Sequence, residues 1–160
     1  MKRIVSVIVV LFVLFQLKGQ ENNQLDKLVI SSIKSYIIDD KNLVRQKFSL
    51  MDTSRYYICM DGLPANFPCD SVHNVTFFSL NNLEGLPNSF KHKLKKGIKT
   101  LFVGLKISNN QIVITVTGRS VKRTKKSNIS IVTGDWGVSI YEYSCEKQKW
   151  ELKETKYGGI

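Results

Sequence analysis

The chain of 160 residues is poor in the residue types that carry most enzyme chemistry. It holds only two histidines, His73 and His92, and three cysteines, Cys59, Cys69 and Cys145. No two cysteines have the CxxC spacing of a zinc site, and the histidines are not placed as their partners. Phosphate-binding GxxxxGKS/T, GxSxG, HExxH and calcium-loop patterns do not occur. The sequence therefore predicts no metal and no cofactor, and it indicates no catalytic residue.

Acidic residues are missing from one long stretch. No aspartate or glutamate lies between Glu84 and Asp135, although eleven lysines and arginines do. Such a one-sided field concentrates anions near the surface, so the candidate partners are an anionic glycan, a lipid head group or an acidic protein, with nucleic acid not favoured. The alternative is a solvated surface that only keeps the protein soluble. The candidate anion-binding residues are Lys91, Lys95, Lys96, Lys99, Arg119, Lys122, Arg123, Lys125 and Lys126.

Only one long apolar run is present, and it lies at the N-terminus. Two basic residues precede the fourteen mostly apolar residues from Ile4 to Leu17. This run matches the core of a signal peptide and is shorter than the roughly 20 residues that cross a bilayer. We expect cleavage after Gly19, which leaves residues 20–160 as a single secreted or periplasmic domain with no transmembrane span. An uncleaved anchor is the alternative.

Export would place the cysteines where disulfides form. Cys59 and Cys69 are the nearest pair and flank a loop with proline and glycine, so they are the candidate disulfide. Closing this ring would stabilise the fold by about 2.8 kcal/mol in the chain-entropy model. Cys145 would then stay free and buried, although its pairing with either of the others remains open.

Hydrophobic periodicity predicts two helices. Apolar residues from Leu25 to Ile37 recur at intervals of three and four, which predicts a helix over about residues 23–40 that the polar DDKN run then ends. Pro87 and Gly97 bracket a second helix. The basic last turn of that helix has a structural explanation of its own, because the helix dipole favours cations there.

Alternating apolar residues predict the strands. Asn109-Asn110 suits a tight hairpin, and the segments 119–126 and 134–137 are predicted as a basic loop or hairpin tip and as a turn. Residues 43–50 are ambiguous and could include a short strand. The predicted strands cover residues 55–60, 72–80, 98–107, 112–117, 128–133, 138–145 and 149–156.

This order of elements indicates an α+β fold. We expect two helices packed on one face of a curved, mostly antiparallel sheet of about five to seven strands. The cystatin-like and NTF2-like folds share this plan by element order alone. No diagnostic motif supports membership in either family.

Aromatic residues offer a second candidate surface. Trp136, Tyr141 and Tyr143 could stack on a sugar or a base if they are exposed. The alternative is that they belong to the core or to cross-strand pairs, because aromatic side chains bury large areas.

Two functions follow from these patterns. The first is a non-enzymatic binding module whose basic surface holds an anionic partner. The second is a cell-envelope hydrolase or inhibitor with a cleft near Asp61, Asp70 and His73. A turn is the simpler explanation for Asp61, because Gly62 follows it and an aspartate next to a glycine is typical of turns.

Overall fold

The computed structural model describes residues 24–42, 56–108, 110–124 and 128–159. The predicted signal peptide, the ambiguous segment 43–50 and the candidate residues Lys125 and Lys126 lie outside this part of the chain.

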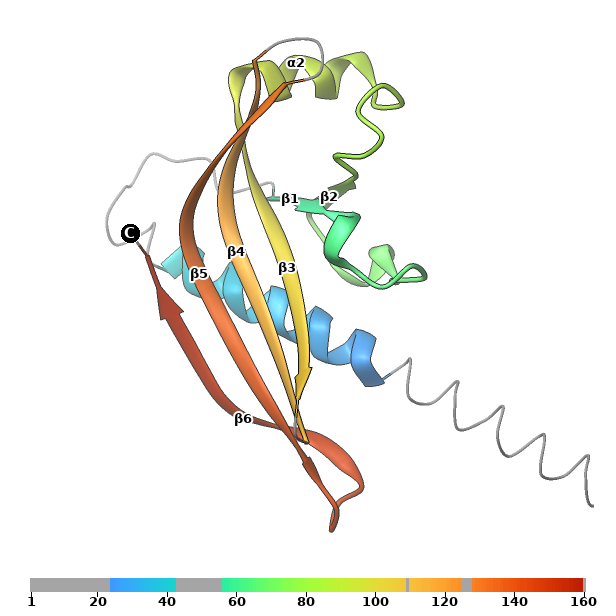
Figure 1. Cartoon of the computed structure of the whole chain (residues 1–160), viewed down its shortest axis with the longest axis vertical. Helices are drawn as coiled ribbons and strands as arrows, with labels where there is room; N and C mark the ends of the chain where they lie inside the picture. Colours follow the sequence, from blue (N-terminus) through green and yellow to red (C-terminus); the bar gives the residue numbers. More distant parts are fainter. Residues whose placement is uncertain (1–23, 43–55, 109, 125–127, 160) are drawn as a thin grey trace, which may run out of the picture.

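Six strands form one mixed sheet in the order β2-β1-β3-β4-β5-β6. The short strand β1 is parallel to both of its neighbours, whereas β3 to β6 form an antiparallel succession. The four later strands run side by side along the length of the molecule (Figure 1). The strands are β1 (Tyr56–Cys59), β2 (Val75–Phe78), β3 (Ile98–Ser108), β4 (Gln111–Arg123), β5 (Ile129–Ser144) and β6 (Lys149–Gly158).

Two helices accompany the sheet within the described residues, which confirms the α+β plan. The first helix spans residues 24–42, and the second, α2, spans Asn88–Lys96. Two 3-10 turns, Met60–Gly62 and Cys69–Ser71, lie in the connection from β1 to β2. Figure 1 shows the first helix crossing the long strands, while α2 lies at one end of the molecule.

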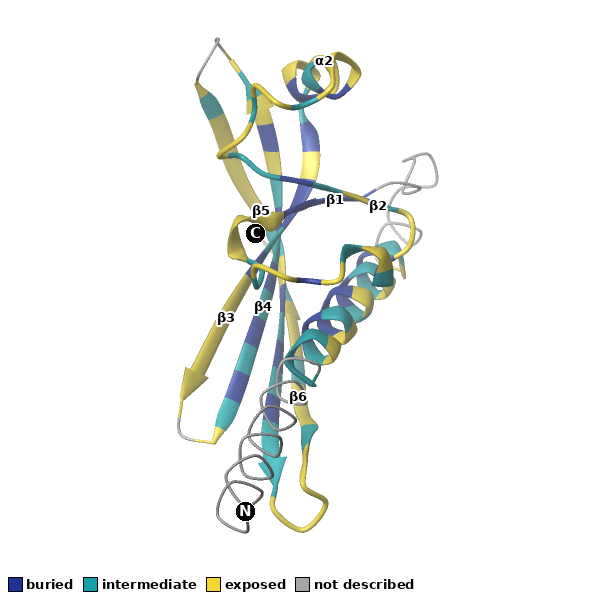
Figure 2. Cartoon of the chain, turned by 90° about the vertical axis from the view of Figure 1, so that its right-hand side faces the viewer, coloured by how far each residue is buried: buried dark blue, intermediate teal, exposed yellow. Residues whose placement is uncertain are grey.

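The predicted placement of both helices on one face of the sheet is wrong. The first helix packs against a core that includes Ile58, Leu101 and Val103. Helix α2 packs into a second core that includes Tyr57 and Ile98. Successive residues of a strand point to opposite faces of the sheet. Tyr57 and Ile58 are neighbours in β1, and Ile98 and Leu101 are three residues apart in β3, so each pair points to opposite faces. The two cores therefore lie on opposite sides of the sheet. Figure 2 shows the buried side of the first helix turned toward the strands.

Strands β4 and β5 are longer than the sequence predicts. Residues 119–123 belong to β4, and the predicted turn at 134–137 lies inside β5. The pairing shifts there, because Thr117 faces Trp136 whereas Arg119 faces Thr133. Gly134 and Asp135 therefore oppose the single residue Gly118, which is a β-bulge. The bulge accommodates residues of the predicted turn, and β4 and β5 stay paired on both sides of it.

Two predicted chain reversals are confirmed. Asn110, at the hairpin between β3 and β4, has φ of 61°, the left-handed conformation that asparagine tolerates. Gly97 ends α2 with φ of 98°, and its N–H donates to the carbonyl of Lys93. These local signals fix the start of β3 and its return as β4.

Candidate functional site

Helix α2 and the adjacent part of β4 bring several predicted anion-binding residues together. Lys95 and Lys96 occupy the last turn of α2, and the Cβ of Lys122 lies 3.9 Å from the position that a Cβ on Gly97 would take. None of these lysines forms an ion pair with a described residue, and the same holds for Lys91 one turn earlier. We call Lys91, Lys95, Lys96 and Lys122 the basic end.

One described acidic residue, Glu84, contacts this region. Its carboxylate accepts a hydrogen bond from Arg123 at 2.9 Å, and its backbone carbonyl accepts one from Lys91 at 2.7 Å. The Arg123 side chain is only 9% exposed, so this predicted anion-binding residue is committed to an internal contact. The four lysines of the basic end therefore carry its positive field.

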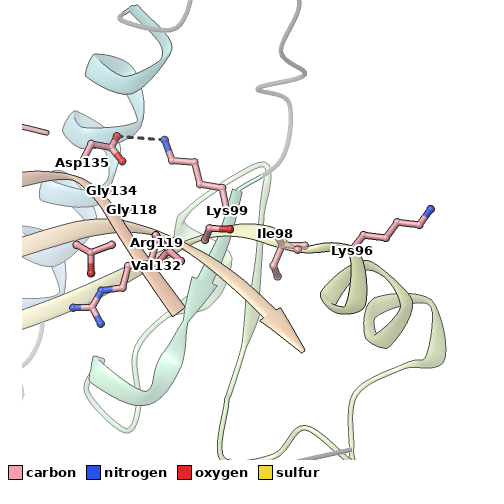
Figure 3. A pocket seen from close by; sticks show the side chains of 11 residues that line it. Lys96, Ile98, Lys99, Gly118, Arg119, Val132, Gly134 and Asp135 are labelled. Atoms are coloured by element: carbon pink, nitrogen blue, oxygen red, sulfur yellow. Dashed lines mark hydrogen bonds and ion pairs between the residues drawn. The ribbon is translucent and has the colours of Figure 1, made fainter. Parts of the chain in front are cut away.

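Lys99 does not join the basic end. Its ammonium lies 2.7 Å from Asp40 of the first helix and 3.3 Å from Asp135 of β5. Figure 3 shows Lys99 reaching toward Asp135, whereas Lys96 extends away from it. Lys99 thus ties the end of the first helix to the sheet, and its charge is balanced by these two carboxylates.

Two tyrosines complete this polar cluster. Tyr56 donates a hydrogen bond of 2.8 Å to Asp40, whose side chain is only 6% exposed. The buried hydroxyl of Tyr36 makes no well-aligned hydrogen bond, although it lies beside the carboxylate of Asp135. We call Tyr36, Asp40, Tyr56, Lys99 and Asp135 the carboxylate cluster.

The cluster shifts the protonation of its members. Burial, followed by the neighbouring carboxylates, raises the pKa of Tyr36 and of Tyr56 far above the usual value, so both hydroxyls keep their protons. Burial also raises the pKa of Asp135, but the Tyr36 hydroxyl and the Lys99 ammonium outweigh it and hold that pKa below its usual range. Asp135 is therefore ionised at neutral pH.

Gly118 is what allows this arrangement. A Cβ at this position would lie 2.4 Å from Asp135 Oδ1 and 2.5 Å from the Tyr36 hydroxyl oxygen. Both oxygens therefore lie in the space that the Cβ of any residue other than glycine would fill. The bulge in β5 sets Asp135 opposite this glycine.

A recess of about 400 Å³ lies between the basic end and the carboxylate cluster. Lys96 and Lys99 line it together with the hydroxyl residues Ser120 and Thr133, and Asp135 lies at its wall (Figure 3). Cations, hydroxyls and one carboxylate can bind a ligand that carries both anionic groups and hydroxyls.

Arg119, another predicted anion-binding residue, packs against the sheet. Its guanidinium lies 4.8 Å from the centre of the Phe102 ring, and its Nε is buried without a hydrogen-bond partner. The register places Arg119 on the face opposite Lys99, because its cross-strand neighbour is Thr100. Arg119 nevertheless also lines the recess, together with Lys96 and Lys99 (Figure 3).

The predicted aromatic surface is only partly available. Tyr141 is 4% exposed and its hydroxyl lies 3.0 Å from Ser32 Oγ, so it belongs to the core and not to a surface. Tyr143 is half-buried and packs edge-on against Trp150. Trp136 is 38% exposed, on the face opposite the first helix, and it lies in β5 instead of a turn.

The predicted disulfide between Cys59 and Cys69 is not formed. All three cysteines are free thiols, and Cys145 is exposed instead of buried. Cys69 packs against the core beneath the first helix, whereas strand alternation places Cys59 on the other face with Tyr57. Burial raises the pKa of the Cys59 thiol, which lies 3.4 Å from the Asp61 carboxylate. The sheet therefore separates the two sulfur atoms.

The residues of the alternative cleft share no hydrogen bond or ion pair within the described part of the chain. Asp61 accepts hydrogen bonds from Ser79 Oγ and from the backbone N–H of Leu80. No hydrogen bond or ion pair between described residues joins Asp61 to Asp70 or to His73, and His73 is exposed. Asp61 closes the connection between β1 and β2, which is a structural role. Among all the residues that the structure describes, no group of three histidine, cysteine or acidic side chains could hold a metal ion.

Sequence reasoning missed Tyr36, Asp40 and Tyr56. The sequence pattern places Asp40 in the polar run that ends the helix, whereas the helix continues to residue 42. A signal was present, because positions 29, 33, 36 and 40 follow the same helical spacing and all four are buried.

No described helix is both long and apolar enough to cross a membrane.

Comparison with protein-family models, with characterised proteins and with solved structures finds no match to this chain.

Proposed function

We propose that this chain is an exported, non-enzymatic binding protein that holds an anionic glycan at its basic end. The observation that carries the proposal is that Lys91, Lys95 and Lys96 of α2, and Lys122 beside Gly97 at the end of that helix, form no ion pair among the described residues. An uncompensated cluster of this kind raises the local concentration of a polyanion and speeds its encounter with the protein. Export remains the prediction from the N-terminal apolar run, and a mature chain that begins at Gln20 would support it.

The recess favours a glycan over the other anionic partners. Its lining includes Ser120, Thr133 and Asp135 as well as the cationic residues Lys96, Lys99 and Arg119. Sugar hydroxyls both donate and accept hydrogen bonds, so they can use the carboxylate and the hydroxyls while sulfate or carboxylate groups contact Lys96. A flat lipid surface would leave these recessed groups unused, and an acidic protein offers fewer hydroxyls.

The test is retention on immobilised heparin, with a variant and a matched control. The variant Lys95→Gln, Lys96→Gln, Lys122→Gln removes three charges from the basic end. The control removes the three lysines of β6, Lys149, Lys153 and Lys156, in the same way. Each control lysine is paired with a glutamate, at 3.6, 3.1 and 3.0 Å respectively. Both variants therefore change the net charge equally.

We expect the basic-end variant to leave heparin at clearly lower salt than the wild type, and the control to elute close to it. The slope of log affinity against log salt should fall by about one for each lost lysine contact, as for other polyanions. Equal losses in both variants would mean that only net charge matters, and the proposal would then be wrong. Binding to anionic vesicles or to an acidic protein without binding to heparin or sulfated dextran would also overturn it.

The hydrolase or inhibitor alternative keeps its own test, although no contact between described residues favours it. Turnover of cell-wall or glycan substrates that is lost in Asp61→Asn, Asp70→Asn and His73→Ala would favour it. The curvature of the sheet and the cystatin-like or NTF2-like plan also stay predictions.

A further inference from the structure

A second cavity, of about 340 Å³, opens between β2 and the start of α2. Tyr57, Phe78 and Phe90 are the buried aromatic residues in its lining, and Leu86 adds an apolar side chain. The rings pack in defined geometry, with 5.3 Å between the centres of Tyr57 and Phe90 and 5.1 Å between those of Phe78 and Phe90. We call this cavity the aromatic pocket. It borders the core that helix α2 covers.

The polar groups of the aromatic pocket have one sign of charge. Lys93 lines it, and none of the described residues in its lining is acidic. The Lys93 ammonium lies 3.3 Å from the Tyr57 hydroxyl and 6.0 Å from the centre of that ring, and it forms no ion pair with a described residue. Thr76 and Ser89 add hydroxyls from β2 and from the first turn of α2. Among the described residues, the pocket therefore combines an apolar interior with one cation that has no acidic partner.

We propose that the aromatic pocket binds a small aromatic carboxylate, a site separate from the basic end. An aromatic ring would pack edge-on or offset against Phe78 and Phe90, as those rings already pack on each other. The carboxylate would pair with the Lys93 ammonium, and Thr76 or Ser89 would donate a further hydrogen bond. The volume lies at the lower end of the range for small-molecule pockets, which fits a one-ring ligand better than a long acyl chain.

The proposal does not depend on glycan binding, because Lys93 is not one of the four lysines that define the basic end. The probe is phenylacetate, and 2-phenylethanol is its uncharged counterpart of similar size. Both are titrated into the isotope-labelled mature chain and followed by two-dimensional NMR. We expect phenylacetate to saturate a single site and to shift the amide signals of residues 76–78 and 89–93. The triple variant of the basic end should give the same result as the wild type.

Three variants decide the outcome. Lys93→Gln should weaken phenylacetate binding by about two- to five-fold, the range of an exposed ion pair, and leave 2-phenylethanol unchanged. Lys95→Gln, on the same helix but outside the pocket, should change neither. Ser89→Trp, at an exposed position of the lining, should block both ligands while the circular dichroism spectrum stays that of the wild type.

Several results would overturn the proposal. One is equal binding of the charged and uncharged probes in the wild type, and another is equal loss in Lys93→Gln and Lys95→Gln. Shifts that map away from the pocket, or binding that survives in Ser89→Trp, would place the ligand elsewhere. Decanoate that saturates the pocket while phenylacetate does not would show that the site takes aliphatic chains instead of aromatic acids.

Discussion

Replacing Gly118 by alanine tests whether the carboxylate cluster is as tightly fitted as its geometry indicates. The new Cβ would lie 2.4 Å from Asp135 Oδ1 and 2.5 Å from the Tyr36 hydroxyl oxygen. Ordinary van der Waals contact begins at 3.4 Å, so each oxygen has to retreat by nearly 1 Å. Tyr36 is 2% exposed and surrounded by core, and the 3.3 Å contact between Asp135 and Lys99 would be lost.

These changes set the expected magnitude. Overpacking a filled site costs about 1–3 kcal/mol. Loss of the half-exposed ion pair adds up to about 1 kcal/mol. We therefore expect Gly118→Ala to lower the free energy of unfolding by about 2–4 kcal/mol in urea titrations at pH 7. A second substitution, Tyr36→Phe, removes one of the two crowded oxygens and should recover about 1 kcal/mol of that loss, as coupled neighbours do.

Gly104 provides a matched control on the adjacent strand. A Cβ there would lie 3.9 Å from its nearest neighbours, both atoms of Thr115, and the residue is exposed. Gly104→Ala should therefore stabilise the protein by about 0.5 kcal/mol, because alanine has fewer unfolded conformations to lose. If Gly118→Ala were as stable as Gly104→Ala, the described convergence of Tyr36 and Asp135 on Gly118 would be refuted.

Two further predictions concern the same cluster. Tyr56→Phe removes the hydrogen bond to the buried Asp40 carboxylate and should cost about 1.5–3 kcal/mol in urea unfolding, so an unchanged midpoint would show that the bond contributes nothing. Because the folded pKa of Asp135 lies below its unfolded value near 3.8, its contribution is complete above about pH 5 and is lost as the pH falls through the folded pKa. Asp135→Asn should thus flatten the fall in unfolding free energy between pH 5 and 3, and an unaltered acid profile would contradict this assignment.

Signals within a few residues of each other predicted the elements well. The helical spacing from Leu25 to Ile37 gave the first helix, and Pro87 with Gly97 gave the bounds of α2 to within a residue. Asn110 adopts the left-handed conformation that its hairpin requires. Backbone preferences of this kind act locally, and at these positions the rest of the chain does not oppose them.

Predictions that depended on contacts between separate segments of the chain were less accurate. The segment from Gly134 to Gly137 has strong turn chemistry, yet its pairing with β4 keeps it inside a strand. Cys59 and Cys69 are close in sequence, but the sheet lies between their side chains. Proximity along the chain carried no information about the face on which a side chain would point.

The same division applies to the candidate sites. The excess of lysine over acid from residue 85 to 134 is a property of the sequence, and so is the basic last turn of α2. Tertiary structure decided which of those lysines form ion pairs and which do not. The bulge opposite Gly118 sets Asp135 beside the first helix, where Lys99 is drawn to it and to Asp40, while Lys95, Lys96 and Lys122 stay unpaired. Composition determines how much charge a chain carries, but only the register of the strands determines which charges meet.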